Sequence, residues 1–323
     1  MYSAIFIFLL AVGLSLFVQT SLASVPMAKY DRHLNTYLNA IIVGQQACLN
    51  LHLRCTVAIK SPTGITKALA KMGNVLPETV SVALSKAFTS GTFGIATDNI
   101  RAFSNPGKPY YNINGFSYQG GQIITLTGGI PVYVHGRLIA GVGVASSPST
   151  QANHKWPRVW IAHDQRIAQI VVDYIAQHYN DKSVKLQTHF PKSFVKVNSF
   201  EVRLIQSLPA TLKACYQLGH YCNVAVDDTH GTPIFIAQMD GALPMIESFA
   251  QAKAMTSASI GQPTSLIQTL SQPNEPYYGV QHFKPFGRGV NWVSLPGGLP
   301  IFINHQLRGG IGITANKEGA QQH

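Results

Sequence analysis

The sequence predicts an α+β fold made of two tandem copies of one domain, each built around an antiparallel sheet. Three observations predict it: identical residues recur at a fixed distance along the chain, each half carries one pair of cysteines with the same spacing, and each half shows the same order of apolar helices and short β-branched strands. The length of 323 residues suits two domains of about 150 residues each.

The repeat keeps one register over most of its length. The second cysteine pair is the first shifted by 167 residues, and Lys253 repeats Lys86 in the same register. Downstream, a two-residue insertion changes the shift to 169, so that Gly-Gly-Ile-Pro at 128–131 corresponds to Gly-Gly-Leu-Pro at 297–300. So many matches in one register indicate an internal duplication.

The elements of the second copy follow from apolar periodicity and turn residues. A helix with apolar positions three and four residues apart is expected over 204–216, with Pro209 as a site for a kink. Further along the chain, we expect a hairpin of strands 223–226 and 233–237, a helix over 245–260, and strands at 290–294, 301–303 and 307–314, the last two joined by a turn at 304–305.

One predicted helix breaks the symmetry between the copies. After a polar loop at 146–157, the first copy continues into a helix over 159–179 that has no counterpart in the second, and we expect this helix to pack across both domains. The expected boundaries are a first domain at 29–179, a polar and basic linker at 180–199, and a second domain at 200–316.

Composition excludes some classes of protein. With 46% hydrophobic and 11% charged residues, the chain is too apolar to be disordered. The formal net charge of +11 favours anionic partners. The lysines and arginines are scattered singly, without a basic run interleaved with aromatic residues, so we expect no nucleic-acid partner.

The first residues indicate export. Residues 5–18 are apolar or small, and Ser21-Leu22-Ala23 forms a small-x-small cleavage pattern, which predicts a signal peptide over residues 1–23 and a periplasmic or secreted protein. This apolar run is shorter than the roughly 20 residues that span a bilayer, so no stable membrane span is expected. An uncleaved anchor is the alternative, because no Lys or Arg precedes the apolar run.

Export places the four cysteines in an oxidising compartment. The C-x6-C spacing predicts one disulfide between Cys48 and Cys55 and another between Cys215 and Cys222. Closing a loop of eight residues contributes about 2.5 kcal/mol in the chain-entropy model. The alternative is metal binding, for which two cysteines at this spacing, without a Cys-x-x-Cys pair or clustered histidines, make a poor zinc motif.

Short motifs connect the second copy to a known family. They are Val-Ala-Val-Asp-Asp-Thr-His-Gly at 224–231, Met-Asp-Gly-Ala at 239–242, Lys-Ala-Met-Thr at 253–256, Gly-Gln-Pro-Thr at 261–264, Leu-Pro-Gly-Gly-Leu-Pro-Ile at 295–301 and Gly-Gly-Ile-Gly at 309–312. Together they resemble the GlcG/HbpS-like family, whose relatives include haem-binding extracellular proteins and the C-terminal domain of PduO-type proteins. The resemblance implies a profilin-like sheet with helices on its faces. It also implies domains that associate, so the tandem pair would form an internal pseudo-dimer able to assemble further into a homo-oligomer.

The first copy departs from the family pattern at two turns. Ser61 stands where the second copy has Asp228, and Gly73 stands where it has Asp240. If the family pocket uses these acids, the first copy is degenerate and the working site lies mainly in the second.

Several residues of the second copy are candidates for binding an anion. Lys253 and Thr256 lie three apart on one helical face, where an ammonium and a hydroxyl can hold a carboxylate such as a haem propionate. A tight Gly-Gly turn can offer backbone N–H groups to the same anion. The alternative for each is structural: a solvated lysine, a buried threonine, a plain turn. The ligand-binding candidates are Asp228, Asp240, Lys253, Thr256, Gly297 and Gly298, and His230 is the candidate iron ligand.

The function implied is that of an exported protein that binds haem, as its cofactor, or a related anionic tetrapyrrole, mainly in the second domain. One alternative is a lyase or isomerase for a small organic acid, with Asp228 and Lys253 transferring protons. Another is a non-catalytic interaction module. The sequence contains no nucleophile elbow, zinc-protease motif or phosphate-binding loop, so it identifies no catalytic residue.

Overall fold

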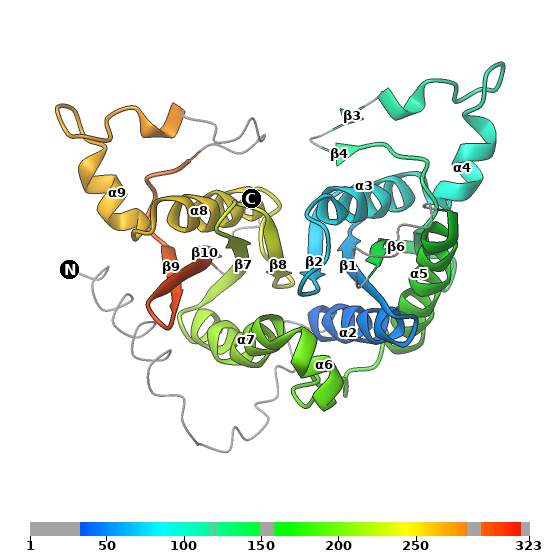
Figure 1. The fold of residues 1–323 in the computed structure, drawn as a ribbon, viewed down its shortest axis with the longest axis horizontal. Coiled ribbons are helices and arrows are strands. Elements are labelled where there is room, and N and C mark those ends of the chain that lie inside the picture. The colour runs from blue at the N-terminus through cyan, green and yellow to red at the C-terminus, as the bar shows by residue number, and fades with distance from the viewer. Residues whose placement is uncertain (1–32, 116, 119–120, 149–157, 283–291, 318–323) are drawn as a thin grey trace.

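The two copies of the repeat join their strands into one eight-stranded sheet with the order β5-β6-β1-β2-β8-β7-β10-β9 (Figure 1). The computed structural model describes residues 33–115, 117–118, 121–148, 158–282 and 292–317. The first copy supplies β1 (Leu53–Lys60), β2 (Thr66–Lys71), β5 (Gly129–Val134) and β6 (Arg137–Pro148), and the second supplies β7 (His220–Asp228), β8 (Pro233–Gln238), β9 (Gly298–Ile303) and β10 (Gln306–Lys317). The pairings are antiparallel, which confirms the α+β prediction.

Helices cover both faces of this sheet (Figure 1). One face carries α3 (Glu78–Phe93) and α8 (Ile246–Ile260), and the other carries α2 (Leu34–Asn50), α5 (Arg158–His178) and α7 (Ser199–Gln217). Shorter elements lie outside these layers: α4 (Thr97–Phe103), η1 (Ile113–Gly115), β3 (Ser117–Tyr118), β4 (Gly121–Gln122), α6 (Lys192–Val197), α9 (Thr264–Leu270) and η2 (Val280–His282).

Most predicted elements of the second copy are present. The helix expected over 204–216 is α7 with Pro209 inside it, and the turn at 304–305 has positive φ at both residues. The strand expected at 290–294 is wrong for its described part, since residues 292–294 belong to no strand and 290–291 lie outside the described residues. The reason is local: the Val293 N–H donates to the Thr256 hydroxyl at 2.9 Å instead of to a neighbouring strand.

The extra helix of the first copy is present as α5, but it does not pack across both domains. It packs against α2, β5 and β6, all of the first copy. The side chains of Ile167, Val171 and Ile175 on α5 are fully buried, as expected for the apolar stripe of an amphipathic helix. α5 therefore closes one face of the first copy alone.

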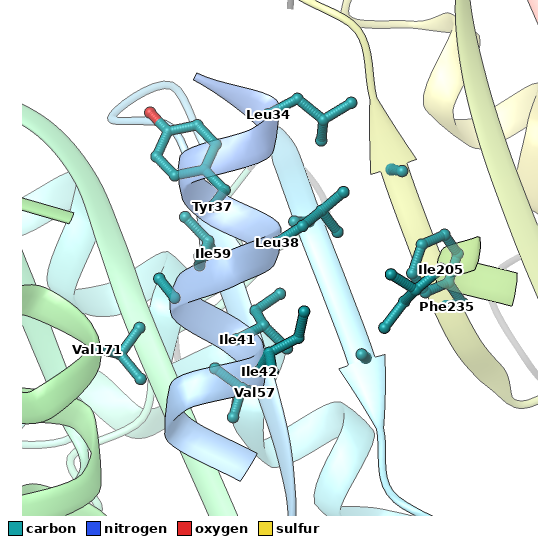
Figure 2. Packing of buried hydrophobic residues seen from close by; sticks show 14 of the residues in the cluster. Leu34, Tyr37, Leu38, Ile41, Ile42, Val57, Ile59, Val171, Ile205 and Phe235 are labelled. Atoms are coloured by element: carbon teal, nitrogen blue, oxygen red, sulfur yellow. The ribbon is translucent and has the colours of Figure 1, made fainter. Parts of the chain in front are cut away.

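The copies meet edge to edge along equivalent strands. In the register of β2 with β8, Leu69 lies opposite Ile236 and Ala70 opposite Phe235. Glu247 of α8 accepts a hydrogen bond from the Thr66 N–H at 3.0 Å across the same junction. Figure 2 shows the core continuing through it, from α2 to Ile205 and Phe235 of the second copy. This is the internal pseudo-dimer that the resemblance implied.

Both predicted disulfides are present, Cys48–Cys55 and Cys215–Cys222. Each ties the end of a helix, α2 or α7, to the strand that follows it. These cysteines are therefore not metal ligands. No helix in the described part of the chain is both long and apolar enough to cross a membrane. The predicted signal peptide, residues 1–23, lies outside the described residues.

The segment predicted as a linker, 180–199, contains the helix α6 and the first residue of α7. It connects the helix α5 of the first copy to α7 of the second, and its Asn198 side chain accepts a hydrogen bond from the Gly73 N–H at 3.2 Å. The linker thus packs on the turn after β2. The domain boundaries themselves stay predictions.

Glu201, in the first turn of α7, gives the protein a pH-dependent stability. Its side chain is buried, and burial raises its pKa from 4.5 to about 7, with Lys71 acting in the opposite direction. Because the pKa of the folded state is the higher one, the stabilisation is fully present below about pH 4.5 and is lost as the pH rises through 7.

Replacing this acid by its neutral isostere, Glu201→Gln, is therefore expected to raise the free energy of unfolding at pH 8 by about 3 kcal/mol and to change it little at pH 4. Urea unfolding at the two pH values measures this. Glu78→Gln, at an exposed position in the first turn of α3, is the matched control and is expected to change the free energy of unfolding little. An equal effect of Glu201→Gln at both pH values would contradict the assignment.

Candidate functional site

Lys86, on α3 of the first copy, forms a closed ion pair. Its Nζ donates to the Val144 carbonyl and to Asp164 Oδ2, both at 2.7 Å, and only 2% of the residue is exposed. Asp164 of α5 also accepts from the N–H of Ser146 at 3.1 Å and from its hydroxyl at 2.5 Å. Burial lowers the pKa of Lys86, and the Asp164 carboxylate counteracts that shift. In the first copy, the charge of the buried lysine is therefore balanced by a carboxylate of the same copy.

Lys253, the counterpart on α8, is a buried cation without a counter-charge among the described residues. It is 7% exposed, and its Nζ donates to the Ile313 carbonyl at 3.2 Å, as Lys86 does to Val144. Within the described ranges no carboxylate forms an ion pair with it. Burial lowers its pKa. Both copies thus bury this lysine, but among the described residues only Lys86 is paired with a carboxylate.

The Gly-Gly turn lies directly beside this ammonium. Gly297 has φ +112°, and a Cβ there would lie 2.7 Å from the Ile313 carbonyl oxygen and 3.2 Å from Lys253 Nζ, so only glycine fits. In the first copy the N–H of Gly128 donates to Gln165 Oε1 of α5 at 3.0 Å. The Gly297 N–H donates to no described residue, and Gly297 is exposed whereas Gly128 is buried.

Thr256 and Gly298 hold this turn in place. The Gly298 N–H donates to Thr264 Oγ1 at 2.8 Å. The Thr256 hydroxyl donates to the Ala252 carbonyl at 2.7 Å and accepts from the Val293 N–H. Thr89 makes the corresponding bonds in the first copy. Thr256 therefore positions the loop that leads into the turn, and its hydroxyl is already engaged.

Asp228 lies at the end of β7, away from Lys253. Its Oδ1 accepts from the N–H groups of His230 and Thr232, at 2.9 and 3.0 Å, in a side-chain-closed turn. Ser61 closes the equivalent turn of the first copy through its hydroxyl. In the sheet Asp228 is opposite Gly309, four residues and about 13 Å along β10 from Ile313. The two groups proposed for proton transfer are not brought together.

His230 and Asp240 also lie apart from the lysine. His230 is exposed in the turn between β7 and β8. Asp240 lies in the turn after β8, where its Oδ2 accepts the His33 N–H at 3.2 Å across the copy junction. In the parts of the chain that the structure describes, no group of three His, Cys, Asp or Glu residues could hold a metal ion. The structure brings together Lys253, Thr256, Gly297 and Gly298 and separates Asp228, His230 and Asp240 from them.

Sequence reasoning missed an apolar surface next to Lys253. It consists of four side chains on the α7 side of β9 and β10, and we call it the open face: Leu299, Ile301, Ile311 and Ile313. All four are partly exposed. Their counterparts under α5 are buried: Ile130 at 7%, and Val132, Val142 and Val144 at 0% exposure. The signal that could have found the open face is the predicted helix without a counterpart, combined with the 169-residue register.

Comparisons with known proteins agree with this duplicated architecture. A family model described as haem-degrading protein, HbpS-like, matches residues 34–155 and 205–323. No curated protein matches.

Three solved structures are similar to the chain. A haem complex of PduOC is 22% identical, covering 44% of this chain and 91% of its own, with a TM-score of 0.37. The protein ORFY of Klebsiella pneumoniae is 18% identical over 49% and 97%, with a TM-score of 0.38. A double mutant of Streptomyces reticuli HbpS is 21% identical over 49% and 90%, with a TM-score of 0.35. Because the family model matches both copies and most of the chain, this protein belongs to the HbpS-like family and carries that domain twice.

Proposed function

We propose that this protein is an exported binding protein for haem or a related anionic tetrapyrrole, with its site mainly in the second copy. The observation that carries the proposal is Lys253, a buried ammonium whose counterpart has a carboxylate and which itself has none among the described residues. A buried cation without a partner is costly, so a ligand anion there gains a strong interaction. The two disulfides support a periplasmic or secreted location.

The residues present fit such a ligand. An ammonium and a backbone N–H suit a propionate, and the apolar open face beside them suits a macrocycle. Lys253 would hold the carboxylate. His230 stays the predicted iron ligand, although its turn, where β7 ends, lies apart from Lys253 and next to Met255 of α8. Haem bound there supplies an iron with a coordination position for imidazole. A lyase or isomerase that pairs Asp228 with Lys253 is not favoured, because about 13 Å of strand separates the two.

Titration of the purified protein with haemin, followed at the Soret band, tests this function. We expect saturation at one haem per chain, because α5 closes the equivalent surface of the first copy. His230→Ala is expected to shift the spectrum, and His135→Ala, a histidine in the β5–β6 turn of the first copy, is the control that should not. Two haems per chain would mean that the first copy also binds. Absence of saturable binding would overturn the proposal.

A further inference from the structure

We propose that the second copy binds the carboxylate of its ligand at Lys253 and the apolar body of that ligand on the open face, the place that α5 fills in the first copy. This inference rests on the proposed function and adds to it the location and the chemistry of the site. The ligand class is a flat apolar acid, because the surface combines a sheet face of aliphatic side chains with one buried cation at its edge.

The first copy shows what covers this surface when it is closed. There α5 packs over β5 and β6, its Ile167 and Val171 side chains are fully buried, and its Asp164 forms an ion pair with Lys86. One amphipathic helix, α5, thus supplies both the apolar side chains that cover the sheet and the carboxylate that binds the lysine. In the second copy α7 packs against β7 and β8, and no described helix covers β9 and β10 on this side. Among the described residues the open face therefore has no counterpart of α5 over it.

The donors that bind α5 in the first copy have counterparts in the second. Asp164 and Gln165 accept from four donors: Lys86 Nζ, the Gly128 N–H, and the N–H and hydroxyl of Ser146. The counterparts are Lys253, Gly297 and Ala315, of which Ala315 offers its N–H alone. The Ile313 N–H points to the Gly297 side of β10, where it donates at 2.9 Å. Since N–H groups alternate along a strand, that of Ala315 points to the same side, beyond the start of β9. Lys253 Nζ has one described acceptor, the Ile313 carbonyl, whereas the N–H groups of Gly297 and Ala315 donate to no described residue.

Charge decides which occupant is favoured. The open face alone would suit any apolar surface, but Lys253 adds a positive charge that is 7% exposed and uncompensated among the described residues. An acidic ligand neutralises that charge, and its body covers the apolar side chains so that water contacts the site only at its edge. A charge-assisted bond in such a place favours the acid over its neutral ester by roughly tenfold to a hundredfold.

A comparison of haemin with haemin dimethyl ester tests the carboxylate. In the wild-type protein haemin is expected to bind roughly tenfold to a hundredfold more tightly than the ester. In Lys253→Met this preference is expected to be largely lost, because the cation that distinguishes the acid from the ester is gone and the backbone N–H groups of Gly297 and Ala315 distinguish them more weakly. Lys213→Met, an exposed lysine on α7, is the control and should keep the preference.

A second pair of variants tests the open face. Ile311→Asp places a negative charge in the middle of the face and is expected to weaken haemin binding at least about tenfold, by desolvation and by repulsion of the ligand carboxylate. Phe302→Asp is the control, because Phe302 is 55% exposed and neighbouring side chains of a strand point to opposite faces. Urea unfolding of each variant establishes that it is folded before binding is measured.

The outcomes separate this inference from the proposed function. Loss of the acid preference in Lys253→Met together with weak binding in Ile311→Asp supports the site. Haemin binding that is unchanged in both variants overturns the site but leaves haem binding standing. If the wild-type protein binds neither compound, the proposed function fails, and this inference fails with it.

Discussion

Replacing Lys86 by methionine is expected to lower the free energy of unfolding by about 3–5 kcal/mol, whereas the same replacement at Lys253 is expected to leave it unchanged or raise it. The two lysines occupy equivalent positions and are nearly equally buried. Lys86→Met strands the buried Asp164 carboxylate, whose pKa burial already raises. Lys253→Met removes a buried charge that no described carboxylate balances.

Urea unfolding of the ligand-free protein measures the difference between these two variants. A third protein, Lys86→Met combined with Asp164→Leu, separates charge from packing. Replacing both members of a buried pair by apolar residues of similar volume is often neutral, so this variant is expected to recover most of the lost stability. Equal destabilisation by Lys86→Met and Lys253→Met would mean that Lys253 has a structural counter-charge of its own.

Shortening Phe235 to alanine is expected to lower the free energy of unfolding by about 3–5 kcal/mol and to shift the unfolding of both copies together. Phe235 is 1% exposed on β8, opposite Ala70 of β2, and packs in the core that continues into α2 (Figure 2). The two copies share one sheet and one core at this position. Loss of the Phe235 ring is therefore expected to weaken the packing of both copies.

Calorimetry with circular dichroism checks this effect. The expected result is one cooperative transition in the wild-type protein and one, at lower temperature, in Phe235→Ala. Phe302→Ala, a Phe→Ala change at a 55% exposed position on β9, is the control and should shift the transition little. Two separate transitions, with only one moved by Phe235→Ala, would show that the copies fold as independent units.

Much of the fold follows from the sequence because local chemistry determines it. The C-x6-C spacing predicts the disulfides, and periodic apolar residues predict α7 and α8. The strand expected at 290–294 fails because a long-range bond from Val293 to Thr256 replaces strand pairing. The joining of β2 to β8 could not be predicted, because a strand such as Thr-Lys-Ala-Leu-Ala-Lys has small apolar residues that fit many partners.

The candidate site was predictable in part. The repeat register identifies Lys253 and the Gly-Gly turn, and the structure places them side by side. The family resemblance predicts Asp228 and Asp240 as site residues. The structure shows them closing a turn and bridging the copy junction. The lack of a counter-charge for Lys253 among the described residues could not be seen in the sequence, because the pairing of Lys86 with Asp164 spans 78 residues and depends on how α5 folds back.

The most direct test of this account is a crystal structure of the protein crystallised with haemin. We expect one haem per chain, lying on β9 and β10 of the second copy, with a propionate oxygen about 2.7–2.9 Å from Lys253 Nζ. A haem bound to the first copy, or one whose propionates lie away from Lys253, would contradict it.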